Sequence, residues 1–268
     1  MRRKPAVAGY FYPGRREELA EMITRMTDLE MKREKAICAI SPHAGFVYSG
    51  PVAGAVFSSV ILPDTFVILG PSHRGISSQL AIMKEGVWET PLGNVPIESQ
   101  LATRIMENSP LIVEDERAHS EEHSLEVQLP FIQFFKKEFS IVPICLSYDV
   151  SYEELEEFGK AVSQGIQDFE KEVLIVASTD MSHYVSQKTA EKKDFLAIDR
   201  MLKLDPKGLY DTVQKEEISM CGFQPTTAAL IASKELGAKK AELIKYQTSG
   251  DTSGDYAQVV GYAGLRIS

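Results

Sequence analysis

Short apolar runs alternate with longer amphipathic stretches along this 268-residue chain, and this alternation is the strongest constraint on its fold. Strands are expected at residues 36–40, 66–69, 141–146, 173–177, 241–246 and 257–266. Helices are expected at residues 15–31, 50–60, 98–108, 125–135, 152–167, 188–204 and 225–236. Alternating strands and helices predict an α/β fold with a central, mostly parallel or mixed sheet and helices on both faces. The length suits a single domain over residues 1–268.

Three local patterns carry further expectations. Residues 80–83 and 86–88 predict the two strands of a side hairpin. Pro130 is expected to kink the helix at residues 125–135, because proline lacks the N–H that the helix needs. The polar loop at residues 246–255 is either a pocket lining or a flexible hairpin turn.

Composition excludes several classes of protein. The net charge of -9 disfavours a nucleic-acid binder, which normally presents a basic face. No run reaches the roughly 18 apolar residues of a membrane span, and no secretory signal core is seen. Three cysteines cannot form a disulfide framework, which predicts a cytoplasmic protein with reduced thiols.

Three of the five histidines follow apolar runs directly: His43, His73 and His183. The carboxyl ends of strands in an open α/β sheet form the edge where ligands bind. Imidazole is the commonest metal ligand and the usual acid or base near neutral pH. We therefore expect a site at this edge, most simply a metal site.

Each of these segments also has a purely structural interpretation. His43 sits between Pro42 and Gly45, in a turn where its ring could simply bond a backbone carbonyl. Arg74, next to His73, either holds an anionic group or is solvated. Asp180 can orient His183 or raise its basicity, and Ser178, Thr179 or Asp180 can cap the next helix; the two interpretations are compatible.

The segment from His119 to His123 matches the inverted zinc-peptidase pattern His-x-x-Glu-His. That pattern needs both histidines on one helix face, whereas Ser120 resembles a helix N-cap and apolar periodicity begins only at Leu125. We therefore expect His123 to point inward and His119 to lie at the surface.

Cys221 precedes a glycine and the start of a predicted helix. A helix N-terminus lowers the pKa of a thiol, which suits a thiolate ligand or nucleophile. The alternative is a small buried apolar residue, and Cys38 and Cys145 fit that interpretation better because both lie inside apolar strands.

Taken together, these segments resemble the Memo family nearly end to end. The resemblance rests on the order of several motifs, which follow one another as in the family: Arg3-x-Pro5-Ala6-Val7-Ala8-Gly9-x-Phe11-Tyr12-Pro13, Ser41-Pro42-His43-Ala44-Gly45, Gly70-Pro71-Ser72-His73, Glu122-His123-Ser124-Leu125-Glu126-x-Gln128-Leu129-Pro130, Ser178-Thr179-Asp180-x-Ser182-His183 and Cys221-Gly222.

The resemblance implies a fold similar to class III extradiol dioxygenases, which are non-haem iron enzymes that open catechol rings. It also implies a divalent transition metal, iron first and copper or zinc as alternatives, with His43, His73 and Cys221 as ligands. His123, Asp180 and His183 would line the same pocket. Those dioxygenases have a carboxylate where this chain has Cys221, and a thiolate is softer and itself oxidisable.

Three functions follow as hypotheses. The first is a metal-dependent, dioxygenase-like oxidoreductase. In it His183, supported by Asp180, is the general base, and His123 is a second proton donor or stabilises an oxygen. The second is a non-catalytic adaptor that binds a peptide or small molecule in the same pocket. The third is a hydrolase with Cys221 as nucleophile. The substrate, the partner and the oligomeric state are left open by the sequence.

Overall fold

The apolar runs form the parallel centre of a mixed sheet in the computed structural model, which describes residues 1–75 and 78–268. Four neighbouring parallel strands make up this centre: β2 (Cys38–Ser41), β9 (Val173–Ser178), β3 (Thr65–Pro71) and β8 (Ser140–Leu146). Nearly all of their residues are buried, as expected for strands covered on both faces.

Antiparallel strands extend the sheet on both sides. On one side β12 (Val259–Ile267) pairs with β2, and it also pairs with β11 (Ala241–Thr248) and β10 (His183–Val185). On the other side β4 (Leu80–Ile82) runs antiparallel to β8 and parallel to β7 (Ile112–Glu114).

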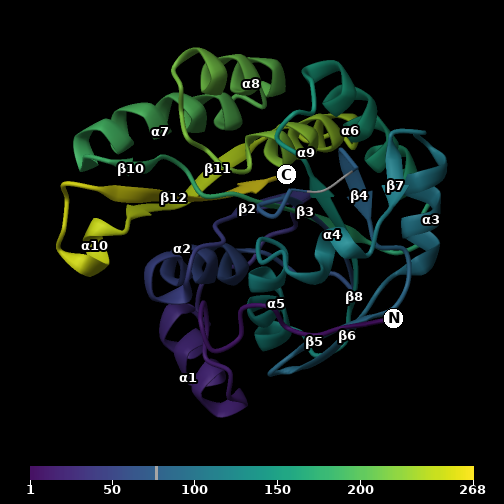
Figure 1. Cartoon of the computed structure of the whole chain (residues 1–268), viewed down its shortest axis with the longest axis horizontal. Coiled ribbons are helices and arrows are strands. Elements are labelled where there is room, and N and C mark those ends of the chain that lie inside the picture. The colour runs from purple at the N-terminus through teal and green to yellow at the C-terminus, as the bar shows by residue number, and fades with distance from the viewer. Residues whose placement is uncertain (76–77) are drawn as a thin grey trace.

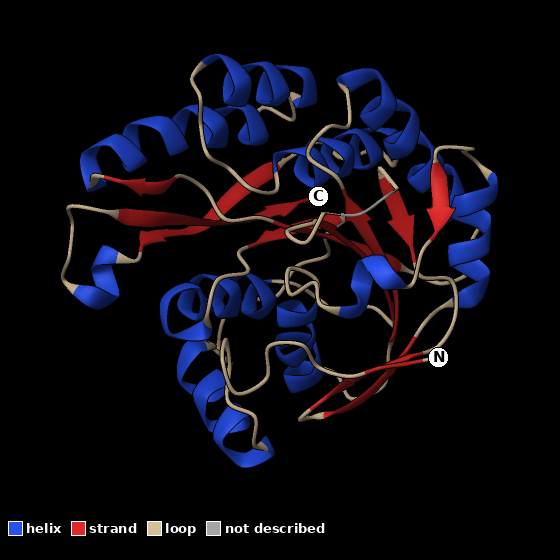
Figure 2. Ribbon diagram, in the orientation of Figure 1, coloured by secondary structure: helices blue, strands red, loops and turns tan. Residues whose placement is uncertain are grey.

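Helices cover both faces of the sheet (Figures 1 and 2). One face packs against α3 (Ser99–Glu107), α6 (Tyr152–Gln167), α7 (Gln187–Leu202), α8 (Pro206–Lys215) and α9 (Phe223–Glu235). The other packs against α1 (Arg16–Met26), α2 (Phe46–Ser59) and α5 (Leu129–Phe135). Along β3, Val67 and Leu69 enter the first core while Phe66 and Ile68 enter the second. The predicted single α/β domain with a mixed sheet is confirmed.

The expected side hairpin at residues 80–83 and 86–88 is wrong. Strand β4 is fully buried and joins the main sheet. The chain turns away at Gly86, whose φ of +120° suits glycine. Strand β5 (Val87–Thr90) then forms a separate three-stranded sheet with β1 (Arg2–Arg3) and β6 (Gly93–Pro96). The N-terminus therefore supplies the pairing partner that local sequence could not reveal.

The kink expected at Pro130 is also wrong. A 3₁₀ turn, η1 (Glu126–Gln128), comes first, and α5 begins at Leu129, so Pro130 lies in its first turn. Proline is tolerated there because the first N–H groups of a helix have no partner within the helix.

Three short helices were not expected from the apolar pattern. They are α4 (Arg117–Ser120), α8, and α10 (Gly250–Ser253) inside the polar loop at residues 246–255. Helix α7 is capped by Ser186, so the Ser178–Asp180 segment does not cap this next helix along the chain. Among the residues that the structure describes, each helix is too short or too polar to traverse a bilayer.

Candidate metal centre

Three segments that are far apart in the sequence converge at the carboxyl edge of the parallel strands. His43 follows β2, His73 follows β3, and Cys221 lies just before α9. His43 Nε2 is 3.1 Å from Cys221 Sγ. One donor atom from each of the three side chains lies within 4.8 Å of the other two. The ligand set implied by the resemblance is therefore brought together in the fold.

The His43 ring is anchored on the side that faces away from Cys221. Its side chain is buried, and its Nδ1 lies 3.0 Å from Ser178 Oγ. The backbone N–H of His43 donates to Asp180 Oδ1 at 2.8 Å, which fixes the turn after β2. Burial, followed by the charges of His123 and His73, holds the pKa of His43 well below its usual value. At neutral pH this imidazole is therefore uncharged, which is the form that binds a metal.

His73 is anchored by the buried carboxylate of Glu122. Its Nδ1 lies 2.9 Å from Glu122 Oε1, and its backbone N–H donates to Oε2 at 2.6 Å. Burial alone would raise the pKa of Glu122, but the hydrogen bonds and charge of His73 outweigh burial and lower it well below the usual value. In the neutral form of His73, the ionised carboxylate accepts the proton of Nδ1, which leaves the lone pair on Nε2 for a ligand.

Cys221 does not have the lowered pKa expected at a helix N-terminus. Burial raises the pKa of its thiol well above the usual value, and the nearby Asp180 carboxylate raises it further. The backbone N–H of Asp180 donates to Sγ at 3.3 Å, and hydrogen bonds of this kind lower the pKa without offsetting burial. Helix α9 begins at Phe223, and its first turn does not outweigh the loss of solvation. A cation would have to displace the thiol proton.

Gly222 allows the Cys221 turn to pack against the end of β9. A Cβ atom at this position would overlap the backbone carbonyl of Ser178 and the side chain of Thr179. Gly222→Ala is expected to lower the free energy of unfolding by about 1–3 kcal/mol, because a buried backbone must move. Urea denaturation checks this. Gly237→Ala, where a Cβ meets nothing within 4 Å, tests instead the strain of a φ of +93°. A neutral Gly222→Ala would contradict the packing argument.

Donor atoms of Asp180, His183 and Cys221 also lie within 4.8 Å of one another, and Asp180 Oδ2 lies 3.9 Å from His43 Nε2. The hydrogen bonds of His183 do not involve Asp180. His183 Nδ1 instead contacts the carbonyl of Ser219 at 2.8 Å. Asp180 Oδ1 is committed to the N–H groups of His43 and Ala44. Burial raises the pKa of Asp180 despite these hydrogen bonds.

His123 lies beside the rings of His43 and His73, whereas the surface position expected for His119 is wrong. The His123 ring lies 4.5 Å from the His73 ring and 4.7 Å from the Phe11 ring, measured between centroids. Burial lowers the pKa of His123 to about 4. His119 is fully buried on α4, with its Nδ1 3.3 Å from Cys145 Sγ. The two histidines thus have different surroundings, which argues against the zinc-peptidase interpretation.

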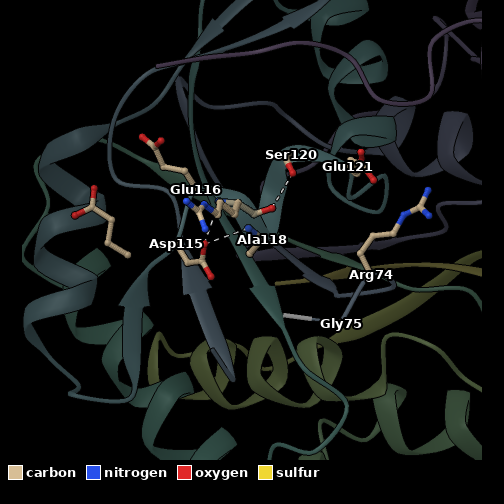
Figure 3. Close-up of a pocket in the computed structure, with 9 residues that line it drawn as sticks. Arg74, Gly75, Asp115, Glu116, Ala118, Ser120 and Glu121 are labelled. Atoms are coloured by element: carbon tan, nitrogen blue, oxygen red, sulfur yellow. Dashed lines mark hydrogen bonds between the residues drawn. The ribbon is translucent and has the colours of Figure 1, made fainter. Parts of the chain in front are cut away.

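A wide polar cleft of about 650 Å³ opens beside the His73 loop, and Figure 3 shows Arg74 at one end with Asp115 and Glu116 at the other. The described residues that line the cleft include four acidic side chains and two arginines, and none of them is a histidine or a cysteine. Arg74 is exposed, which agrees with the solvated alternative for this residue. The candidate ligands His43, His73 and Cys221 therefore do not line this cleft.

Several residues of the site could not be identified as such from the sequence. Glu122, Ser178 and Gln128 hydrogen-bond to the histidines or to one another, and the Phe11 ring lies against the His123 ring. The ring of Tyr148 lies 6.4 Å from that of His73. The only sequence signal for the first four was their place inside the motifs shared with the Memo family.

Comparisons with known proteins identify the family of the chain. The family model described as Memo-like protein matches residues 3–266. A MEMO1 family protein of Methanopyrus kandleri is 41% identical, covering 99% of this chain and 98% of its own length. One from Thermotoga neapolitana is 42% identical, with 100% of both chains covered.

Among solved structures, an uncharacterized protein from Escherichia coli aligns with a TM-score of 0.60. The alignment covers 87% of this chain and 100% of that one, and the identity is 11%, so this likeness concerns the fold alone. The family model and the full-length relatives show that the chain belongs to the Memo-like protein family.

Proposed function

We propose that the chain is a transition-metal-dependent oxidoreductase that uses the pocket formed by His43, His73 and Cys221. The observation that carries the proposal is that donor atoms from three distant parts of the sequence converge, with His43 Nε2 3.1 Å from Cys221 Sγ. Two imidazoles and one thiolate suit iron, copper or zinc rather than magnesium or calcium, which prefer oxygen ligands.

The surroundings of the three ligands support this reading of the pocket. Metal-binding histidines usually hold their second nitrogen to a carboxylate, hydroxyl or carbonyl group, and both His43 and His73 do so here. Such contacts fix the ring and direct the other nitrogen toward the ion. A bound iron or copper ion would supply one-electron chemistry toward dioxygen or a substrate.

The remaining pocket residues would handle protons. His183 is held by Ser219 through Nδ1, so its Nε2 is available to accept a proton from a substrate. His123, whose pKa of about 4 keeps it neutral, would bond the substrate or a developing oxyanion through a ring nitrogen. Asp180 would act on His183 through charge and on His43 through the backbone.

Metal content tests the proposal. Protein purified without oxygen is expected to retain about one transition-metal ion per chain, since a preformed three-ligand site binds tightly. His73→Ala and Cys221→Ala should each lose it, because two remaining ligands do not hold the ion. Inductively coupled plasma mass spectrometry measures the metal content of the wild type and of each variant. Cys38→Ala, a buried cysteine remote from the pocket, is the matched control and should keep its metal.

Oxygen uptake separates an enzyme from a binding protein. With catechols or thiols as substrates, uptake that requires both the metal and His183 supports the oxidoreductase. Full metal content without uptake favours a binding module. Cys221 alkylation that proceeds equally with and without metal would favour the hydrolase, whereas protection by metal supports ligation.

A further inference from the structure

Ser178 is a hub of hydrogen bonds behind the His43 ring. Its hydroxyl oxygen lies 2.6 Å from the carbonyl oxygen of Ser124, 2.8 Å from Gln128 Nε2 and 3.0 Å from His43 Nδ1. All four side chains are buried, so water does not compete for these contacts. A hydroxyl group has one proton to donate and two lone pairs to accept with, and the three neighbours use all of them.

The Ser124 carbonyl can only accept, so it takes the one proton of Ser178. The amide of Gln128 is also oriented without ambiguity, because its Nε2 donates to the Pro42 carbonyl at 2.9 Å. A flipped amide would place Oε1 against that carbonyl, oxygen against oxygen. Gln128 therefore donates its second proton to Ser178, and only one lone pair of Ser178 remains.

The remaining lone pair faces His43 Nδ1, which must then be the protonated nitrogen. We infer that Ser178, set by Ser124 and Gln128, is a positioning residue that keeps the His43 proton on Nδ1 and leaves the Nε2 lone pair facing Cys221. This inference rests on the proposed metal function only for its purpose, since the tautomer is a property of the protein without metal.

The consequence for a metal is direct. A neutral imidazole can carry its proton on either nitrogen, and only the unprotonated one binds an ion. If the proton moved to Nε2, it would point at Cys221 Sγ, 3.1 Å away, and occupy the position that the ion needs. His73 is held in the same tautomer by a carboxylate. A hydroxyl group at His43 and a carboxylate at His73 thus both keep the proton on Nδ1.

The test compares Ser178→Ala with Ser41→Ala. Ser41 lies beside Ser178 in the register of β2 and β9, is equally buried, and among the described residues its hydroxyl has no hydrogen-bond partner. Both substitutions remove one buried oxygen atom, so both variants are expected to fold. Long-range ¹H–¹⁵N spectra of the metal-free, ¹⁵N-labelled proteins report the tautomer, with His43→Gln used to assign the His43 signals.

The wild-type protein and Ser41→Ala should show His43 protonated on Nδ1 at neutral pH. In Ser178→Ala the Nδ1 proton loses its acceptor, so the signal should shift toward protonation on Nε2. Titration with Co²⁺, followed by the thiolate-to-cobalt absorption, should show affinity weakened about 10- to 100-fold in Ser178→Ala but not in Ser41→Ala.

Nε2 protonation in the wild type, or an unchanged tautomer in Ser178→Ala, would overturn the inference. An altered tautomer with unchanged Co²⁺ affinity would overturn the positioning role alone. Failure of every variant to bind Co²⁺ would contradict the proposed metal function, while the tautomer spectra would still decide the inference about Ser178.

Discussion

Replacing Glu126 with glutamine is expected to lower the free energy of unfolding by about 3–5 kcal/mol, because it leaves the buried charge of Arg3 without its partner. The Arg3 and Glu126 side chains are 2% and 0% exposed, and Arg3 Nη1 lies 2.5 Å from Glu126 Oε2. Neither group reaches water, so solvation cannot replace the lost ion pair.

Glu126 also fastens the N-terminal segment to the pocket. Its two carboxylate oxygens accept the backbone N–H groups of Ala6 and Val7 and the hydroxyl of Tyr12. This holds Phe11 against His123, and the Phe11 carbonyl accepts the N–H of Phe46 at the start of α2. Glu126→Gln should therefore weaken the contact of Phe11 with His123 as well as lower the free energy of unfolding.

Urea denaturation of the wild type, Glu126→Gln, Arg3→Met and the double variant measures the effect. The double variant should be less destabilised than the sum of the single variants, because it leaves no buried unpaired charge. Glu121→Gln, at an exposed glutamate in the preceding turn, should stay close to the wild type. Additive effects in the cycle would contradict a direct coupling of Arg3 and Glu126.

Much of the fold was predictable because buried positions recur in the sequence with the period of a strand or a helix. Strands such as β3 and β9 are apolar on both faces, and α6 has a clear apolar stripe, so their kind and place followed from pattern alone. The three-residue strand β4 was found at the expected residues but was assigned the wrong pairing partner, because so short a run does not encode its partner. Its pairing with β8 depends on contacts between distant parts of the chain.

The candidate site divides in the same way. Histidines directly after apolar runs were visible, since strand ends meet at one edge of the sheet. The resemblance, rather than spacing, supplied Cys221 as their companion. The burial of His119 and the contact of His183 with Ser219 were not visible, because each depends on a chain segment that approaches from elsewhere.

Glu122 was the largest omission, and its substitution should have the second large effect. Its buried carboxylate accepts the backbone N–H and Nδ1 of His73 and the N–H of Ser124, and His123 Nδ1 lies 3.5 Å away. In Glu122→Gln an amide nitrogen replaces one acceptor oxygen and meets N–H donors. We expect a loss of about 1–3 kcal/mol in stability, since buried donors lose their acceptor.

Glu122→Gln should also weaken metal binding, for a reason separate from the loss of stability. The one amide oxygen that remains is a weaker acceptor than a carboxylate, so it holds the Nδ1 proton of His73 less firmly and increases the basicity of Nε2 less. Co²⁺ affinity should therefore fall by about 10- to 100-fold. Competition with a chelator measures the affinity, and urea denaturation of the same samples measures the stability. Glu121→Gln should leave both unchanged. Full Co²⁺ affinity in a destabilised Glu122→Gln would mean that Glu122 holds the loop together but does not set the His73 ligand.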